Sequence, residues 1–153
     1  MHIPLDEKSL NQKAIYLLSR REYSRTELFQ RLEKYAVSLE ILNLVLDSLV
    51  LNGYQSDKRF TDSFVRQRVQ RYWGPKRIEY ELVQKGISKS LIDETFAQMS
   101  PDWIEIARAL ARKRFSNSHA SSSAKEYAKQ TRYMLNHGFN YDQIKTALDF
   151  EFE

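Results

Sequence analysis

The 153-residue sequence contains no cysteine, which excludes disulfides and cysteine-ligated metal sites. It has only four glycines and three prolines, whereas a protein rich in strands and tight turns needs more of both. No stretch approaches the ~20 apolar residues of a membrane-spanning helix, and the first residues lack the segments of a signal peptide. These absences predict a helical, cytoplasmic protein without a membrane span.

The motifs of common enzyme classes are absent as well. The sequence contains no GxSxG, Walker, HExxH or GxGxxG motif. Its histidines, His2, His119 and His137, are scattered along the chain. Neighbouring carboxylates such as Asp93 and Glu94 point about 100° apart on a helix, so they do not form a catalytic pair. We therefore expect no enzyme activity, no catalytic residue, no cofactor and no metal site.

The charged residues give a modest positive excess. The chain carries 24 Lys and Arg against 20 Asp and Glu, a formal net charge of +4. Charged residues make up 29% of the chain and apolar residues 42%, which fits a packed core covered by solvated helix faces. A balance of this size is compatible with nucleic acid or with an acidic protein as partner, and it does not distinguish them.

Apolar residues recur at helical spacing between residues that start and stop helices. The pattern predicts nine helices, which begin near residues 7, 25, 38, 57, 75, 88, 102, 123 and 140. Ser24 with Glu27, and Ser123 with Glu126, have the spacing of capping boxes. Asp57 is expected to cap the fourth helix. The third helix is expected to turn these residues inward: Ile41, Leu44, Val45 and Leu49.

The order of helices and stops repeats along the chain. A shift of fifty residues places Leu32 on Leu82 and brings Ala36 to the position of Gly86, and a shift of fifty-two places Gly86 on Gly138. One such segment is small for an independent core. We therefore predict an all-α fold of three tandem three-helix repeats, in an elongated or curved body, with these boundaries: residues 1–53, 54–99 and 100–153.

Helical wheels identify outward basic residues as candidates for partner binding. They are Arg59, Arg66, Lys76, Arg77, Arg108, Arg112, Lys125, Lys129 and Arg132. The last three form a stripe beside Tyr133, and a basic stripe next to an aromatic ring can follow a phosphate backbone and stack on a base. The same stripe can instead serve solubility alone. Arg77 has two interpretations too, a partner contact or a solvated pair with Glu81 at i, i+4.

Arg68 is the exception among the arginines of its helix. It falls among the apolar residues of that helix, where an unpaired charge is costly. We predict that its stem is packed and that its guanidinium binds a carboxylate or backbone carbonyls.

Residues 52–88 carry a family resemblance. The stretch NGYQSDKRFTDSFVRQRVQRYWGPKRIEYELVQKGIS resembles bacterial RecX regulatory proteins, with Gly-Tyr, Asp-x-Arg-Phe, Phe-Val, Arg, Gly-Pro-x-Arg-Ile, Glu-Leu and Lys-Gly-Ile in order. The stretch LLSRREYSRTELFQRL and residues 136–139 also fit, so the resemblance covers nearly the whole chain. Gln55 and Ser56 depart from the family's usual aliphatic residue and Asp, and Ser56 is still able to cap a helix.

The resemblance implies a protein of three tandem three-helix repeats that modulates the RecA recombinase. It implies binding in the groove of the RecA filament on DNA, with lowered ATPase and strand exchange. We also expect a monomer, and we leave open whether it contacts single-stranded DNA within the filament. The implied processes are DNA repair, recombination and the end of the SOS response. It assigns no individual contact residue. The alternatives are a direct DNA-binding protein of helix-turn-helix type and a plain helical scaffold.

Overall fold

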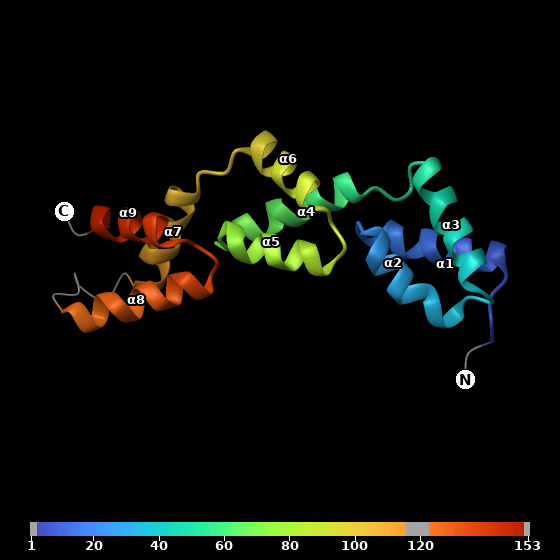
Figure 1. The fold of residues 1–153 in the computed structure, drawn as a ribbon, viewed down its shortest axis with the longest axis horizontal. Coiled ribbons are helices and arrows are strands. Elements are labelled where there is room, and N and C mark those ends of the chain that lie inside the picture. Colours follow the sequence, from blue (N-terminus) through green and yellow to red (C-terminus); the bar gives the residue numbers. More distant parts are fainter. Residues whose placement is uncertain (1–2, 116–122, 152–153) are drawn as a thin grey trace. The chain divides into compact units, whose positions relative to one another are not determined.

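The computed structural model describes residues 3–115 and 123–151, and the regular secondary structure within them is helical (Figure 1). The all-α prediction is confirmed. None of the described helices combines the length and apolar character that a membrane span needs. The helices are α1 (Glu7–Arg20), α2 (Arg25–Leu32), the 3₁₀ helix η1 (Glu33–Tyr35), α3 (Leu39–Leu51), α4 (Asp57–Gln70), α5 (Pro75–Gln84), α6 (Lys89–Met99), α7 (Trp103–Phe115), α8 (Ala124–Asn136) and α9 (Tyr141–Glu151).

Side-chain caps start several helices where the sequence predicts them. Ser24 accepts a hydrogen bond from the backbone N–H of Glu27, and the Glu27 carboxylate accepts one from the N–H of Ser24, at 3.0 and 3.1 Å. Ser123 accepts from the N–H of Glu126 at 3.1 Å. These bonds satisfy donors that have no partner within the helix, so they fix where α2 and α8 begin.

The predicted cap of α4 is corrected. Asp57 is the first residue of the helix, and Ser56 caps it by accepting from the N–H of Arg59 at 3.1 Å. The Asp57 carboxylate accepts instead from the backbone N–H of Arg25 at the start of α2, and from the amide of Gln55, both at 2.9 Å. Asp57 therefore caps a helix that begins 32 residues earlier in the chain.

The described residues divide into two compact units. Unit 1 combines Met1–Ser63 with Leu82–Thr95. In it α1, α2 and α3 pack on one another around a continuous core (Figure 1). The buried residues of this core are Leu10, Ala14, Leu17, Tyr23, Leu28, Leu32, Leu42, Val45, Leu46 and Leu49.

One inward residue of α3 was predicted wrongly. Leu44 is 52% exposed, whereas Leu42 and Leu46 are buried. The helix sequence, LEILNLVLDSLVL, is apolar on nearly every side. Its buried face is therefore set by the contacts with α1 and α2, and the apolar pattern alone does not define it.

Near its beginning, unit 1 also contains a short extended contact. The N–H of Leu5 donates to the carbonyl of Tyr35 at 2.7 Å, and Leu5 forms an isolated parallel bridge with Ala36. The segment before α1 therefore lies against the turn that follows α2 and η1.

Unit 2 combines Phe64–Glu81 with Phe96–Glu153. Here α7 packs against α9 and α8, and α8 packs against α9 (Figure 1). The buried residues of its core are Ala107, Leu110, Ala111, Met134, Phe139, Ile144, Ala147 and Leu148.

Each unit contains a close approach between the start of one helix and a glycine turn. In unit 1 the turn after α5 meets the start of α2: a Cβ on Gly86 would overlap the side chain of Thr26, and Lys85 binds Glu27 at 3.1 Å. In unit 2 the turn after α8 meets the start of α5, where the carbonyl of Gly138 accepts from the N–H of Lys76 at 3.0 Å. The two contacts occupy equivalent positions of the sequence repeat.

Candidate functional site

The predicted contact residues do not all lie together. Arg59 belongs to unit 1 and the other eight belong to unit 2. The guanidinium of Arg59 donates to the carbonyls of Gly53 and Tyr54 at 2.9 and 3.0 Å and to the carboxylate of Glu22 at 3.2 Å. Arg59 therefore holds the turn after α3, and its contact with a partner stays a prediction.

The two candidate arginines of α7 bind the same carboxylate. Arg108 and Arg112 reach Glu105 at 3.5 and 3.0 Å. Arg112 is half-exposed, but the Arg108 side chain is only 22% exposed, which corrects its predicted outward position. Arg108 lies next to the buried Ala107 and one turn from Ala111, so the edge of the packed face of α7 covers much of it.

Arg68 has the structural role that the sequence predicts. Its guanidinium binds Glu81 through two hydrogen bonds, of 3.1 and 3.4 Å, and lies over the ring of Phe64, 4.2 Å from the ring centre. Glu81 also binds Arg77 at 3.5 Å, as the i, i+4 spacing predicts. Both members of the Arg68–Glu81 pair are largely buried, whereas the Arg77 side chain is half-exposed.

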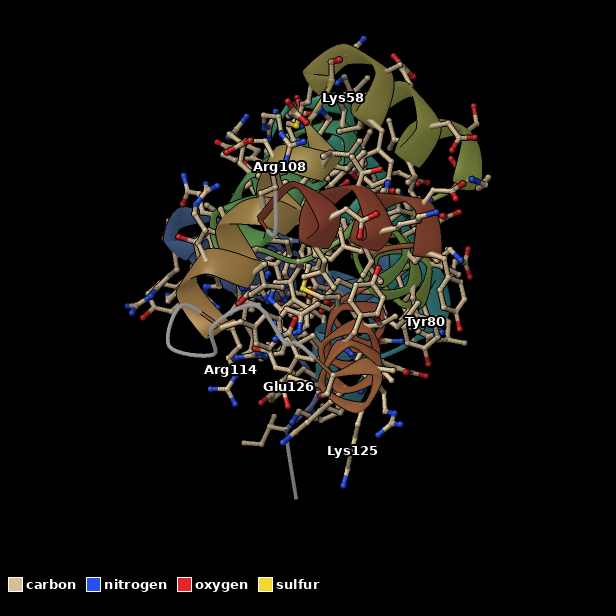
Figure 2. All side chains as sticks on the ribbon, turned by 90° about the vertical axis from the view of Figure 1, so that its left-hand side faces the viewer. Lys58, Tyr80, Arg108, Arg114, Lys125 and Glu126 are labelled. Atoms are coloured by element: carbon tan, nitrogen blue, oxygen red, sulfur yellow. The ribbon has the colours of Figure 1, made fainter. Side chains whose placement is uncertain are left out.

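The stripe on α8 is exposed as predicted. Lys125, Lys129 and Arg132 all face solvent, and Figure 2 shows Lys125 pointing away from the ribbon. Of the other candidates, Arg66 on α4 and Lys76 at the start of α5 are exposed too.

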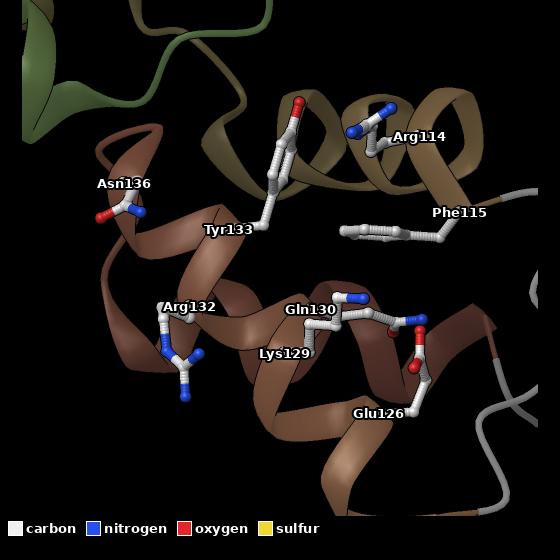
Figure 3. A pocket seen from close by; sticks show the side chains of 8 residues that line it. All are labelled: Arg114, Phe115, Glu126, Lys129, Gln130, Arg132, Tyr133 and Asn136. Carbon is white, nitrogen blue, oxygen red and sulfur yellow. The ribbon is translucent and has the colours of Figure 1, made fainter.

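A groove of about 560 Å³ lies between α7 and α8 (Figure 3). It gathers three cations, of which Arg114 comes from α7 while Lys129 and Arg132 come from α8. The residues that line it are Arg114, Phe115, Glu126, Lys129, Gln130, Arg132, Tyr133 and Asn136. Cations therefore outnumber carboxylates along the groove.

A column of rings continues from this groove. His137 stacks on Tyr133 at 4.7 Å and on Trp73 at 4.3 Å, measured between ring centres. An arginine covers a ring on either side: Arg114 lies 5.2 Å from the centre of Tyr133, and Arg77 lies 4.9 Å from the centre of Trp73. We call the following set the basic–aromatic surface: Trp73, Arg77, Arg114, Lys129, Arg132, Tyr133 and His137.

The backbone holds the column in place. The N–H of Gly74, next to Trp73, donates to the carbonyl of His137 at 2.6 Å. The rings of the column come from the turn before α5, from α8 and from the residue that follows α8. The column therefore forms only when these segments pack together. Cations provide contacts for phosphate or carboxylate groups, and partly exposed rings provide stacking faces. The arrangement is suited to binding.

Burial is the main cause of a lowered pKa of His137. A hydrogen bond to the backbone of Tyr133 acts in the opposite direction, and the charges of Arg77 and Arg114 lower the pKa further. The neutral imidazole is therefore the form that fits the stack. His2 and His119 lie outside the described residues. Across residues 3–115 and 123–151, no three His, Asp or Glu side chains gather into a possible metal site.

His137 should make stability depend on pH. Because the folded state lowers its pKa below the ordinary 6.5, its contribution is complete above pH 6.5 and is lost as pH falls toward the folded-state pKa. We expect the free energy of unfolding to fall between about pH 7 and pH 5, and His137→Phe to reduce this fall because the ring stacks without titrating. Denaturant titrations of both proteins at the two pH values measure this fall in the free energy of unfolding. An equal fall in both proteins would contradict the prediction.

Comparison with known proteins identifies the family. Models of RecX, for its second and third three-helix domains, match residues 56–95 and 101–148. A regulatory protein RecX from Vibrio campbellii is 38% identical over 155 residues, which cover 100% of this chain and 99% of the relative. The chain belongs to the RecX family of regulatory proteins.

Other RecX proteins agree with this assignment. The regulatory protein RecX of Mannheimia succiniciproducens is 42% identical over 127 residues, or 82% of this chain and 83% of the relative. The crystal structure of RecX from Lactobacillus salivarius has the same fold, with a TM-score of 0.84 at 23% identity over 95% of this chain and 96% of that one. The predicted family resemblance is confirmed.

Three members of the basic–aromatic surface were not predicted from the sequence of this RecX-family chain. Trp73, Arg114 and His137 come from different segments, and no spacing rule joins the first to the other two. The separation of Tyr133 and His137 by four residues was a readable signal, because it places both rings on one face of a helix.

Proposed function

We propose that this RecX-family chain binds the groove of the RecA filament on DNA as a monomer and lowers its ATPase and strand-exchange activities. It thereby regulates DNA repair and recombination and helps to end the SOS response. The observation that carries the proposal is the match to regulatory RecX proteins along the whole chain. The mechanism is binding without catalysis, in which several weak contacts add through high effective concentration along the filament.

The basic–aromatic surface supports an anionic contact in this complex. Its cations face acidic side chains or DNA phosphates, and its rings stack on exposed bases. The same observation favours a second candidate, direct binding to DNA without the recombinase. Within that surface we propose Arg77, Lys129 and Arg132 as contact residues. Elsewhere in unit 2 we propose Arg66, Lys76, Arg112 and Lys125, with Arg108 as a partly covered one.

The first test is the rate of ATP hydrolysis by RecA on single-stranded DNA. We expect the chain to lower this rate when it is present at fewer copies than RecA, because one bound molecule affects several subunits of a filament. An unchanged rate at equimolar protein would contradict the proposed function.

Fluorescence anisotropy with labelled single- and double-stranded DNA separates the two candidates. Binding that requires the filament favours the regulator. Tight binding to DNA alone, with a steep loss of affinity as salt rises, favours the direct DNA-binding protein.

A further inference from the structure

The outer face of α3 exposes large apolar side chains. Leu51 is 86% exposed and Leu44 is 52% exposed. Leu39 and Val50 of the same helix and Val37 before it are exposed as well. Side chains this exposed add little to the core, and a surface where several of them gather commonly marks an interaction site.

Four residues of α3 form a line along this outer face. Glu40, Leu44, Asp47 and Leu51 follow one another at i, i+4, i+7 and i+11, so they lie on one side of the helix, and all of them are exposed. The opposite side of α3 carries the residues that pack into the core of unit 1: Leu42, Val45, Leu46 and Leu49. We call these four exposed residues the α3 line.

The charge of the α3 line indicates which kind of partner fits it. Its two charged members are carboxylates, and α3 contains no Lys or Arg, although the chain as a whole is basic. Arg25, from α2, binds Asp47 at 2.7 Å and offsets one of the two negative charges. The α3 line offers a phosphate backbone no cation of its own. A protein segment with apolar side chains bordered by Lys or Arg would be attracted to it.

We propose that the α3 line is a docking surface for a protein segment of this kind. Leu44 and Leu51 enter an apolar contact, as side chains one or two helical turns apart do when a helix lies in a groove, and Glu40 pairs with a basic side chain at the edge. This inference rests on the proposed function, because we assign the recombinase filament as the partner of the α3 line. It differs from the basic–aromatic surface in using apolar contact in place of cations.

The test compares Leu44→Ser/Leu51→Ser with Tyr16→Ser in the intact chain. Both proteins should fold, because the substituted side chains are exposed, and circular dichroism verifies this. Tyr16 is an exposed apolar residue on α1 of the same unit, so it controls for the loss of apolar surface. We expect the double variant to need at least about tenfold more protein for half-maximal inhibition of the RecA ATPase, and the control to match the wild type.

Salt and self-association complete the test. The difference between wild type and double variant should persist at about 0.3 M salt, because apolar contact is not screened. Inhibition by wild type and double variant at equal concentrations would overturn the docking surface while leaving the proposed function intact. Absence of inhibition by the wild type would overturn both. A wild type that sediments as a dimer, with a monomeric double variant, would assign the surface to a second copy and overturn the proposal.

Discussion

Replacing Gly138 with alanine is expected to lower the free energy of unfolding of unit 2 by about 3–4 kcal/mol. Gly138 has a φ of +97°, a conformation that disfavours any residue with a Cβ. An added Cβ would also lie 2.5 Å from the Cβ of Arg77 and 2.6 Å from its backbone nitrogen. Neither neighbour is the movable end of a side chain, so the turn would have to leave the start of α5.

Gly53→Ala is the matched control. Gly53 also has a positive φ, +79°, but an added Cβ there would meet no atom within 4 Å beyond its chain neighbours. The only remaining cost should be that of placing a residue with a Cβ at positive φ, which lowers the free energy of unfolding by about 1 kcal/mol. Urea titrations followed by circular dichroism measure both variants. The chain's two tryptophans, Trp73 and Trp103, lie in unit 2. Their fluorescence should therefore report the destabilisation caused by Gly138→Ala and not that caused by Gly53→Ala. Equal losses would refute the close-approach argument.

Reversing the charge of Arg114 and Lys129 together is expected to weaken binding to the RecA–DNA filament by about tenfold or more at low salt. Both line the groove between α7 and α8, and Arg114 also covers the ring of Tyr133. The variant Arg114→Glu/Lys129→Glu changes the local charge by four units, and its affinity should depend less steeply on salt than that of the wild type.

The matched control changes a lysine elsewhere in unit 2. Lys145 is exposed on α9, outside the residues that line the groove. We expect Lys129→Glu to weaken filament binding several-fold more than Lys145→Glu, measured by anisotropy on labelled DNA coated with RecA. Equal effects would mean that the cations of α8 act through net charge alone, and the stripe would then serve solubility.

The local features of the fold were predictable because their signals lie within a few residues. Ser24 and Glu27 are three residues apart and form the capping box that their spacing indicates. Gly86 and Gly138 follow their helices with positive φ, as helix stops. The place of Arg68 on an apolar face predicted a buried charge, and a buried charge requires a partner. Its partner Glu81 lies only thirteen residues away.

Features that depend on tertiary packing were not predictable. Asp57 has the right chemistry for a cap, but only the folded unit shows that it serves Arg25. The stack of Trp73 on His137 joins residues 64 positions apart. In α3 the sequence allowed several apolar faces, so Leu44 was assigned inward although it is exposed. In each case the contact or the burial of the residue depends on a segment far away in the sequence, and the neighbouring residues are compatible with more than one arrangement.

The contact between Leu5 and the turn at Ala36 occupies the position at which a preceding repeat would pack. Ala36 is equivalent in the sequence repeat to Gly86 and Gly138. Each of those two glycine turns packs against the start of the second helix of the preceding repeat. At Ala36 the place of such a helix is taken by Leu5, which donates to the carbonyl of Tyr35 at 2.7 Å. A fourth repeat joined ahead of the first, or a second molecule adding itself there, would have to displace this segment. The segment before α1 therefore covers the backbone of the one equivalent turn that has no preceding repeat in this sequence.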